Sequence, residues 1–253
     1  MLLMYHHISP ASLIPTEEVI FNENGWMYTI SPEMFEKHIQ YFLRKGFRFV
    51  SMDGYYDTLL KNGKENKKEI VITFDDGWFD NYEFAFPILK RYNIPAIFFI
   101  TTNQFETTDK FKMNVDQIIE MKNAGMTFGS HTCNHKTLSK IELTEARYEI
   151  FKSKEILEKL FHQSIDYFAY PGGAFNSSVA ELVKEAGYKA ACSILSPATN
   201  TVTDKFWLFR NHLSGNLNKF SDYYRLNQLL VNIFGFRIRK KLEVKLNYRN
   251  QEK

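Results

Sequence analysis

Short apolar runs alternate along the chain with longer segments in which apolar residues recur every three or four positions. The short runs predict buried strands, at residues 2–8, 47–50, 70–74, 96–101, 126–131, 167–170, 190–194 and 206–213. The longer segments predict amphipathic helices, at residues 32–45, 80–92, 115–123, 143–161, 177–186 and 220–234. Because strands and helices alternate from one end to the other, we expect an α/β barrel of parallel strands rather than separate blocks.

Single residues mark several of these boundaries. Ser31 is placed to cap the first helix, with Pro32 at its first position, and Gly46 ends it. Pro87 predicts a kink or a break in the helix over residues 80–92, because proline lacks the backbone N–H that the helix needs.

The composition indicates one domain. The chain has 253 residues, of which 44% are hydrophobic, enough for one full-sized core but short for two. We expect a catalytic domain over residues 1–215 and a basic, helical tail over residues 216–253. The net charge of +3 is too small to argue for nucleic acid as a partner.

The cysteines and the start of the chain bear on location. Cys133 and Cys192 are too few for a disulfide framework and fit a reducing compartment, although many exported bacterial proteins also lack disulfides. The apolar start has no basic segment and is interrupted by His6 and His7, so it predicts neither a signal peptide nor a membrane span. We therefore expect a cytoplasmic or already processed protein.

The tail mixes basic and apolar residues. Its basic members between residues 234 and 249 are Arg237, Arg239, Lys240, Lys241, Lys245 and Arg249. Such a segment can lie on an anionic membrane surface, which would make the protein membrane-associated, and a solvated terminal helix is the other interpretation.

Two adjacent carboxylates, Asp75 and Asp76, end the apolar run at residues 70–74. Two anions in a poorly solvated place raise each other's pKa, and a divalent cation removes that difficulty. Successive strand residues point to opposite faces, so one carboxylate can bind the metal while the other faces the substrate. The alternative is a plain Asp-Asp-Gly turn that caps the next helix.

His131 and His135 follow the end of another predicted strand. In a parallel barrel the carboxyl ends of the strands build the site, so these side chains are expected near Asp75 and Asp76. Histidines four residues apart can project to one side of a helical turn and bind one ion. Two imidazoles and a carboxylate favour zinc, and cobalt, nickel or manganese could use the same ligands.

These residues resemble a known family. T-F-D-D-G at residues 73–77 and S-H-T-C-N-H at residues 130–135 are similar to the first two motifs of the polysaccharide deacetylases, carbohydrate esterase family 4. Y-H-H-I near the start and F-x-x-H-x-x-x-F-L-x-x-G-F over residues 35–47 resemble the branch of bacterial poly-N-acetylglucosamine deacetylases. The resemblance implies a distorted (β/α)7-type barrel and metal-dependent removal of N-acetyl groups from amino sugars of a bacterial glycan or its precursor.

The resemblance also implies roles for these residues. Asp75 would be the general base, and a water on a metal held by Asp76, His131 and His135 would be the nucleophile. The family's third motif resembles A-Y-P-G-G at residues 169–173, where Tyr170 would donate its backbone N–H to the oxyanion while Pro171 and Gly172 line the substrate site. A plain turn is the alternative for that string.

The chain departs from the family pattern in three places. Ala169 stands where an arginine commonly orients the catalytic aspartate, and Arg210 is the candidate replacement from the last strand. No Asp plus Trp fourth motif is evident between Cys192 and Lys205. The fifth motif usually reads Leu-x-His and supplies the general acid. His212 is the nearest candidate for that acid, but its spacing is Leu208-x-x-x-His212.

Other candidates carry two interpretations each. His6 could line the substrate groove or be a core histidine, and Trp78 could stack on a sugar ring or lie in the core. His38 and His162, on helices away from the strand ends, are expected at the surface.

The altered motifs also leave alternatives for the activity itself. The same machinery could act as a deformylase or an O-deacetylase, and a catalytically inert carbohydrate-binding module is the alternative of another class. The expected partner is an N-acetylated amino-sugar oligosaccharide or a lipid-linked glycan.

Overall fold

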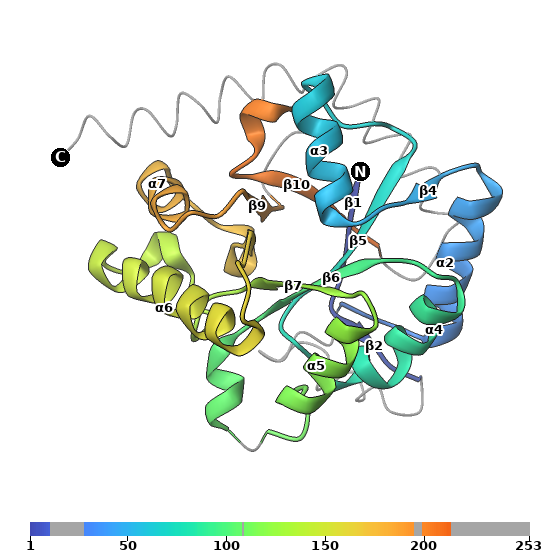
Figure 1. Cartoon of the computed structure of the whole chain (residues 1–253), viewed down its shortest axis with the longest axis horizontal. Helices are drawn as coiled ribbons and strands as arrows, with labels where there is room; N and C mark the ends of the chain where they lie inside the picture. Colours follow the sequence, from blue (N-terminus) through green and yellow to red (C-terminus); the bar gives the residue numbers. More distant parts are fainter. Residues whose placement is uncertain (11–27, 108, 195–198, 214–253) are drawn as a thin grey trace.

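The computed structural model describes residues 1–10, 28–107, 109–194 and 199–213. Seven parallel strands close into a barrel in the order β1-β10-β9-β8-β7-β6-β5, and β5 pairs with β1 to complete the ring (Figure 1). The strands are β1 Leu2–Tyr5, β5 Glu69–Phe74, β6 Ala96–Ile100, β7 Thr127–Ser130, β8 Tyr167–Ala169, β9 Ala190–Ser193 and β10 Leu208–His212. The predicted (β/α)7-type barrel is confirmed.

Three further short strands of the described residues lie outside the ring. β4 Arg48–Phe49 pairs with β5, and β2 His7–Ile8 pairs with β3 Thr29–Ile30 in a separate small sheet. The single strand predicted over residues 2–8 is therefore split at His6, which lies between β1 and β2.

The helices follow the strands along the chain. In the described part of the chain they are α2 Pro32–Arg44, α3 Met52–Asn62, α4 Phe86–Arg91, α5 Val115–Asn123, α6 Leu143–Phe161 and α7 Ser177–Glu185. Short 3-10 turns cover Thr102–Glu106, Leu138–Lys140, Pro171–Gly173 and Val202–Asp204.

Local chemistry sets several boundaries. Ser31 caps α2, since its hydroxyl accepts the N–H of Met34 at 3.2 Å, and Gly46 has a φ of +70° just beyond the helix. The helix predicted over residues 80–92 is divided, because a π-helical turn, Asn81–Ala85, precedes α4 and Pro87 lies in the first turn of α4.

The core has two layers. Outward-facing strand residues pack under the surrounding helices in a large cluster, in which the rings of Phe74, Phe98 and Phe128 follow one another across β5, β6 and β7. Inward-facing residues such as Val71 and Phe99 fill the barrel in a second cluster.

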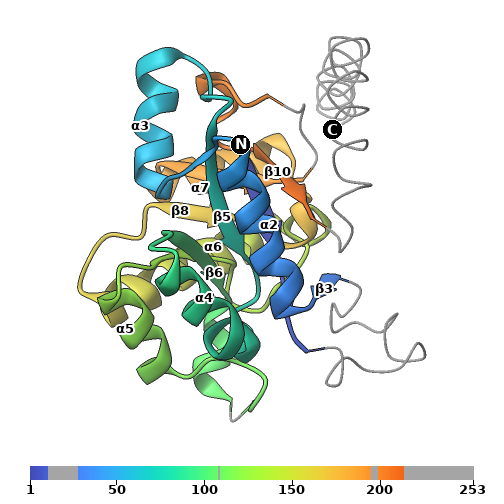
Figure 2. The same ribbon diagram turned by 90° about the vertical axis from the view of Figure 1, so that its right-hand side faces the viewer.

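Helix α3, which the sequence analysis did not predict, belongs to the inner cluster. Its residues Met52, Tyr55 and Leu59 pack against inward-facing strand residues, and Figure 2 places α3 at the end of the molecule where the N-terminus lies. Because parallel strands all begin at that end, α3 closes the amino-terminal mouth and the opposite mouth is left for the site.

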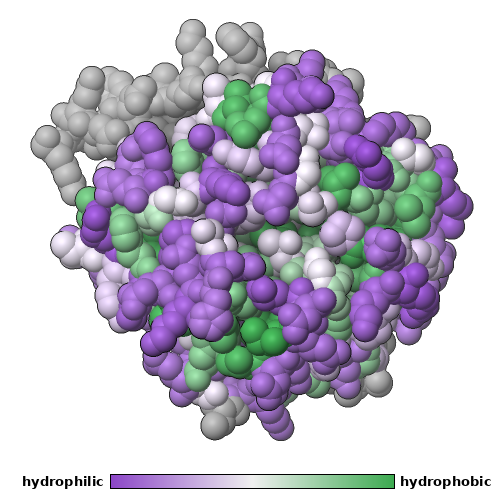
Figure 3. All heavy atoms as spheres, in the orientation of Figure 1, coloured by the Kyte–Doolittle hydropathy of each residue, from purple (hydrophilic) through white to green (hydrophobic). Residues whose placement is uncertain are grey.

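The face seen in Figure 3 is mainly hydrophilic, with apolar residues in small separate patches. Among the residues that the structure describes, no helix is long and apolar enough to cross a membrane. The expected tail over residues 216–253 lies outside the described residues.

Candidate active site

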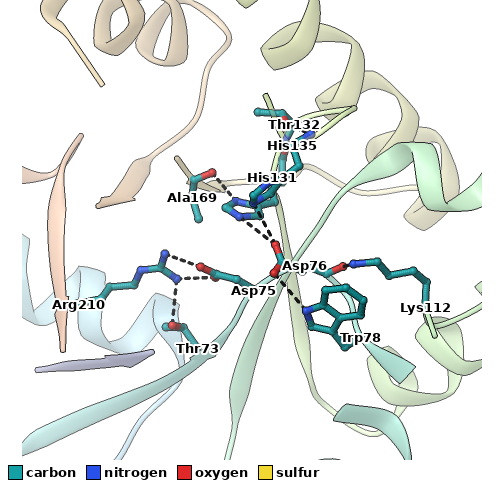
Figure 4. A network of polar contacts seen from close by, with 11 residues as sticks. Thr73, Asp75, Asp76, Trp78, Lys112, His131, Thr132, His135, Ala169 and Arg210 are labelled. Atoms are coloured by element: carbon teal, nitrogen blue, oxygen red, sulfur yellow. Dashed lines mark hydrogen bonds and ion pairs between the residues drawn. The ribbon is translucent and has the colours of Figure 1, made fainter. Parts of the chain in front are cut away.

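The predicted site residues come from five strands and gather where those strands end. Asp75 and Asp76 follow β5, and His131 follows β7 with His135 four residues on. The other strands contribute His6 after β1, Tyr170 after β8, and Arg210 and His212 in β10. Figure 4 shows the polar network that joins several of these side chains.

A tight turn gives the two carboxylates different surroundings. Asp76 has a φ of +72° and Gly77 a φ of +69°, so two consecutive residues take the left-handed conformation. The ammonium of Lys112 donates to the carbonyl oxygen of Asp76 at 2.8 Å, and the N–H of Met113 donates to that of Gly77 at 2.9 Å. The chain does turn here, but the carboxylates pair with charged and aromatic side chains from other strands rather than capping a helix.

Asp75 is held by a buried arginine. Arg210 makes two parallel hydrogen bonds to it, Nη1 to Oδ1 at 2.6 Å and Nη2 to Oδ2 at 2.7 Å, and also donates to Thr73 at 3.2 Å (Figure 4). Burial is the largest single influence and would raise the pKa of Asp75, but the charge and hydrogen bonds of Arg210 and the nearby imidazoles of His131 and His6 together outweigh it, and the pKa is lowered. Asp75 is therefore an ionised, oriented carboxylate.

Asp76, His131 and His135 form the second half of the site. One ligand atom from each lies within 4.8 Å of the others, and the Nε2 atoms of His131 and His135 lie 3.4 and 3.2 Å from Asp76 Oδ1. The other oxygen, Oδ2, accepts the indole N–H of Trp78 at 3.1 Å. Burial opposes ionisation of Asp76, yet the hydrogen bond to His135 and the surrounding histidines together hold its pKa well below the usual range.

This donor set fits a divalent cation. His131 Nδ1 must donate to the carbonyl oxygen of Ala169, 2.7 Å away, and burial lowers the pKa of His131 to about 4, so the neutral ring turns the Nε2 lone pair toward Asp76 Oδ1. Two electron-rich atoms that face each other across this gap repel unless a cation lies between them. Two imidazole nitrogens and one carboxylate oxygen suit a zinc-like ion with open positions.

The spacing of the two histidines predicts that they meet through a helical turn, but they do not. The segment after β7 is irregular, with Thr132 at a φ of +69° and His135 at a φ of +56°. The Thr132 hydroxyl accepts the N–H of His135 at 3.0 Å and closes a tight turn that brings the two rings to a centroid distance of 4.9 Å.

Residues 169–173, which resemble the third motif, form a turn in which the backbone N–H of Tyr170 is already used. The backbone N–H of Tyr170 donates to the carbonyl oxygen of Cys192 at 3.1 Å, and its hydroxyl donates to that of Phe206 at 2.8 Å. Pro171–Gly173 is a 3-10 turn in which Gly172 is exposed, with a φ of +62°. The N–H of Tyr170 thus belongs to the sheet in this structure.

His6 and His212 meet through a residue that the sequence analysis missed. The Tyr28 ring stacks on His6 and meets His212 edge-on, both at a centroid distance of 4.7 Å. Burial lowers the pKa of His212 to about 4 and also lowers that of His6, which in addition feels the charges of Asp75 and Asp76.

Trp78 is half-buried beside the site. Its ring lies 4.3 Å from that of His7, and the ammonium of Lys112 lies 3.2 Å from its centroid. His7 in turn contacts the carboxylate of Asp80 at 2.6 Å. Neither Lys112 nor Tyr28 carries a sequence signal, because each lies in a loop between predicted elements.

The prediction that His38 lies at the surface is wrong. Its side chain is 1% exposed, and its Nδ1 lies 3.2 Å from the hydroxyl of Tyr5. His162 is exposed, as predicted.

A family model described as polysaccharide deacetylase matches residues 62–191, just over half of the chain. A poly-beta-1,6-N-acetyl-D-glucosamine N-deacetylase of Staphylococcus aureus (strain MRSA252) is 29% identical over 224 residues, which cover 82% of this chain and 76% of that protein. The structure of the Streptococcus pyogenes deacetylase PplD in complex with acetate is 29% identical, with a TM-score of 0.75, and the match covers 85% of this chain and 92% of that one. The structure of IcaB from Ammonifex degensii is 25% identical, with a TM-score of 0.71 and coverage of 85% and 91%.

Proposed function

We propose that this chain, which belongs to the polysaccharide deacetylase family, removes N-acetyl groups from the amino sugars of a bacterial glycan. As a family member it is a hydrolase that acts on carbon–nitrogen bonds of linear amides. The observation that carries the proposal is the pairing of an ionised, arginine-held Asp75 with the adjacent group of Asp76, His131 and His135. An inert binding module would have no need of such a buried, charged arrangement.

Asp75 is the proposed general base. Arg210 keeps it ionised and fixes its plane, while each carboxylate oxygen retains a second lone pair that can accept a proton from water. Asp76, His131 and His135 would hold a divalent ion, most simply zinc. When bound, that ion supplies Lewis-acid chemistry, because it acidifies a water and polarises the acyl carbonyl.

The oxyanion donor that we propose is the backbone N–H of Gly172. The N–H of Tyr170 already donates within the sheet, and Pro171 has none, so Gly172 carries the first available donor after β8. Its left-handed φ of +62° and exposed position leave it accessible to a substrate. This moves the role by two residues from the one that the family resemblance implies.

Protonation of the leaving amine is assigned to the histidine pair. His212 is the acid that the resemblance implies, and His6 lies on the other contact of the Tyr28 ring. We therefore place the proton donor at His212. His212→Ala should then lower kcat more than His6→Ala does.

The proposed substrate is a polymer or oligomer of N-acetylglucosamine. A relative of similar length is named for poly-beta-1,6-N-acetyl-D-glucosamine, and a similar structure holds acetate. A lipid-linked glycan, a cytoplasmic location and membrane contact through the basic tail remain predictions, since residues 214–253 lie outside the described part.

The test is acetate release from N-acetylglucosamine oligomers by the purified protein, as isolated, after chelation, and after return of zinc or cobalt. Release that needs the metal and disappears in Asp75→Asn is the expected result. Stoichiometric metal without acetate release would refute this substrate class and direct the search to formyl amides or acetyl esters. Neither metal binding nor release would favour the binding-module alternative.

A further inference from the structure

The segment that carries the two histidines is strained at both ends. Thr132, a β-branched residue, has a φ of +69°, and His135 has a φ of +56°. Left-handed residues other than glycine persist only where their surroundings hold them in place, at about 1–3 kcal/mol each. Something in the fold must therefore fix residues 131–135.

Helix α6 buries a carboxylate against the middle of this segment. Glu149 is 1% exposed, and its Oε2 accepts the backbone N–H groups of Cys133 at 2.9 Å and Asn134 at 2.8 Å. Its Oε1 accepts the side-chain amide of Asn134 at 2.8 Å. These three amide groups are the donors that compensate the burial of this carboxylate.

The same face of α6 holds the beginning of the segment. Ser153 lies four residues after Glu149, one helical turn further on. A chain of hydrogen bonds runs from the N–H of Thr132 to the Ser130 hydroxyl at 3.2 Å, from there to the Ser153 hydroxyl at 2.7 Å, and then to the carbonyl oxygen of Ile150 at 3.0 Å. One face of one helix thus fixes both the start and the middle of the segment.

We propose that Glu149 is a positioning residue for the metal centre, acting through the backbone between His131 and His135. This inference rests on the metal site of the proposed function, and it concerns ligand geometry rather than the deacetylation step. Glu149 touches neither histidine ring in any hydrogen bond described, but it fixes Cys133 and Asn134, two of the three residues between them.

The charge and shape of Glu149 are both needed. Its carboxylate offers acceptors alone, and three N–H groups point at it. Glu149→Gln keeps the shape but removes the charge, and its new amide donor is satisfied only if the Asn134 amide rotates to face it. The two backbone N–H groups are then held by a neutral acceptor and more weakly, so the segment and both imidazoles are less firmly fixed.

The experiment compares Zn²⁺ affinity of the wild type and Glu149→Gln by competition with a chromogenic chelator. A loss of about 10- to 100-fold is expected, the range seen when groups that orient metal ligands are removed. The Co²⁺ absorption spectrum should also change, because the ligands move. Glu155→Gln is the matched control, since Glu155 lies on the same helix, is exposed and pairs only with Lys152 among the described residues.

Several outcomes would overturn the inference. A folded Glu149→Gln variant with zinc affinity within threefold of the wild type and an unchanged Co²⁺ spectrum would show a role in stability alone. If that variant does not fold, Glu149→Asp, which keeps the charge but shortens the reach, must show the same loss of affinity. If the wild-type protein binds zinc but releases no acetate, the proposed activity is refuted, and the comparison of zinc affinities still tests the role of Glu149. If the wild-type protein does not bind zinc, the proposed activity and the role of Glu149 are both refuted.

Discussion

Asp75 and Asp76 are neighbours in the chain but have opposite partners. Asp75 contacts a guanidinium from β10, and Asp76 contacts two imidazoles from the segment after β7. The left-handed conformation of Asp76 and Gly77 separates them. Two carboxylates that would raise each other's pKa are thereby both kept ionised, each by its own counter-group.

The first prediction concerns Arg210. Arg210→Met leaves Asp75 buried without its counter-charge, so burial raises the pKa of the base. We expect kcat/KM at pH 7 to fall by about 100-fold or more, and the acid limb of the pH–rate profile to move to higher pH. Acetate release between pH 4 and pH 9 measures both effects.

The matched control is Arg147→Met, which removes an exposed arginine paired with Glu185. It should leave the profile unchanged. Turnover by Arg210→Met equal to that of the wild type would contradict the role of Arg210.

The second prediction concerns Gly77. In Gly77→Ala, the new Cβ would lie 2.4 Å from Gln104 Oε1 and 2.8 Å from Ile100 Cγ2, at a φ of +69°. Gln104 would have to give up its 2.9 Å hydrogen bond to the carbonyl oxygen of Met113, and the neighbouring Asp76 would shift. We expect a weaker zinc site and a destabilisation well beyond the strain of φ alone.

Gly46→Ala measures that strain separately. Gly46 has a φ of +70° but no atom within 4 Å of an added Cβ, so the variant should lose only about 1–2 kcal/mol. Equal unfolding free energies for the two variants, measured in denaturant, would rule out the close contact at Gly77.

At the scale of elements, the sequence predicts regular helices well and irregular segments poorly. α5 and α6 have the bounds that their apolar periodicity predicts. Helix α3 was not predicted, although its buried residues Met52, Tyr55 and Leu59 have helical spacing and Ser51 and Gly63 mark its two ends. The turn between His131 and His135 could not be predicted either, since the strain at Thr132 is stabilised by Glu149, which lies on another element.

The third prediction concerns the contact between β1 and α2. Burial lowers the pKa of His38 to about 4, so between pH 6.5 and pH 4 the unfolded chain binds a proton that the folded chain does not. Stability should therefore fall as the pH falls, by about 2 kcal/mol between pH 7 and pH 5 from this residue.

The double variant Tyr5→Phe/His38→Leu tests this, because it removes both partners of the 3.2 Å contact. Its unfolding free energy should lose that share of the pH dependence. His162→Asn, which removes an exposed imidazole, is the control. An unaltered slope in the double variant would contradict the prediction.

At the scale of the whole molecule, the alternation of strands and helices was enough to predict a parallel barrel with its site at the carboxyl ends of the strands. Its closure was not predictable from periodicity, because β1 joins β5 and β10 through pairings that are 69 and 208 residues apart at Leu2. Arg210 and Asp75, which are 135 residues apart, could be paired from the sequence only through the family resemblance. Pairings of this kind depend on the three-dimensional register of the strands, which the hydrophobic pattern of one strand does not contain.

The two mouths of the closed barrel have different roles, since one is packed by a helix and the other carries the candidate site. Helix α3 fills the amino-terminal mouth, and the candidate metal ligands lie at the other, so damage at α3 should leave them intact. Leu59 is fully buried there, and Leu59→Ala should lower the free energy of unfolding by about 2–5 kcal/mol with zinc affinity unchanged. Leu60→Ala, at a neighbouring residue that is 48% exposed, should change stability by about 0.5 kcal/mol or less. A loss of zinc affinity in folded Leu59→Ala would show instead that the two mouths are mechanically coupled through the strands.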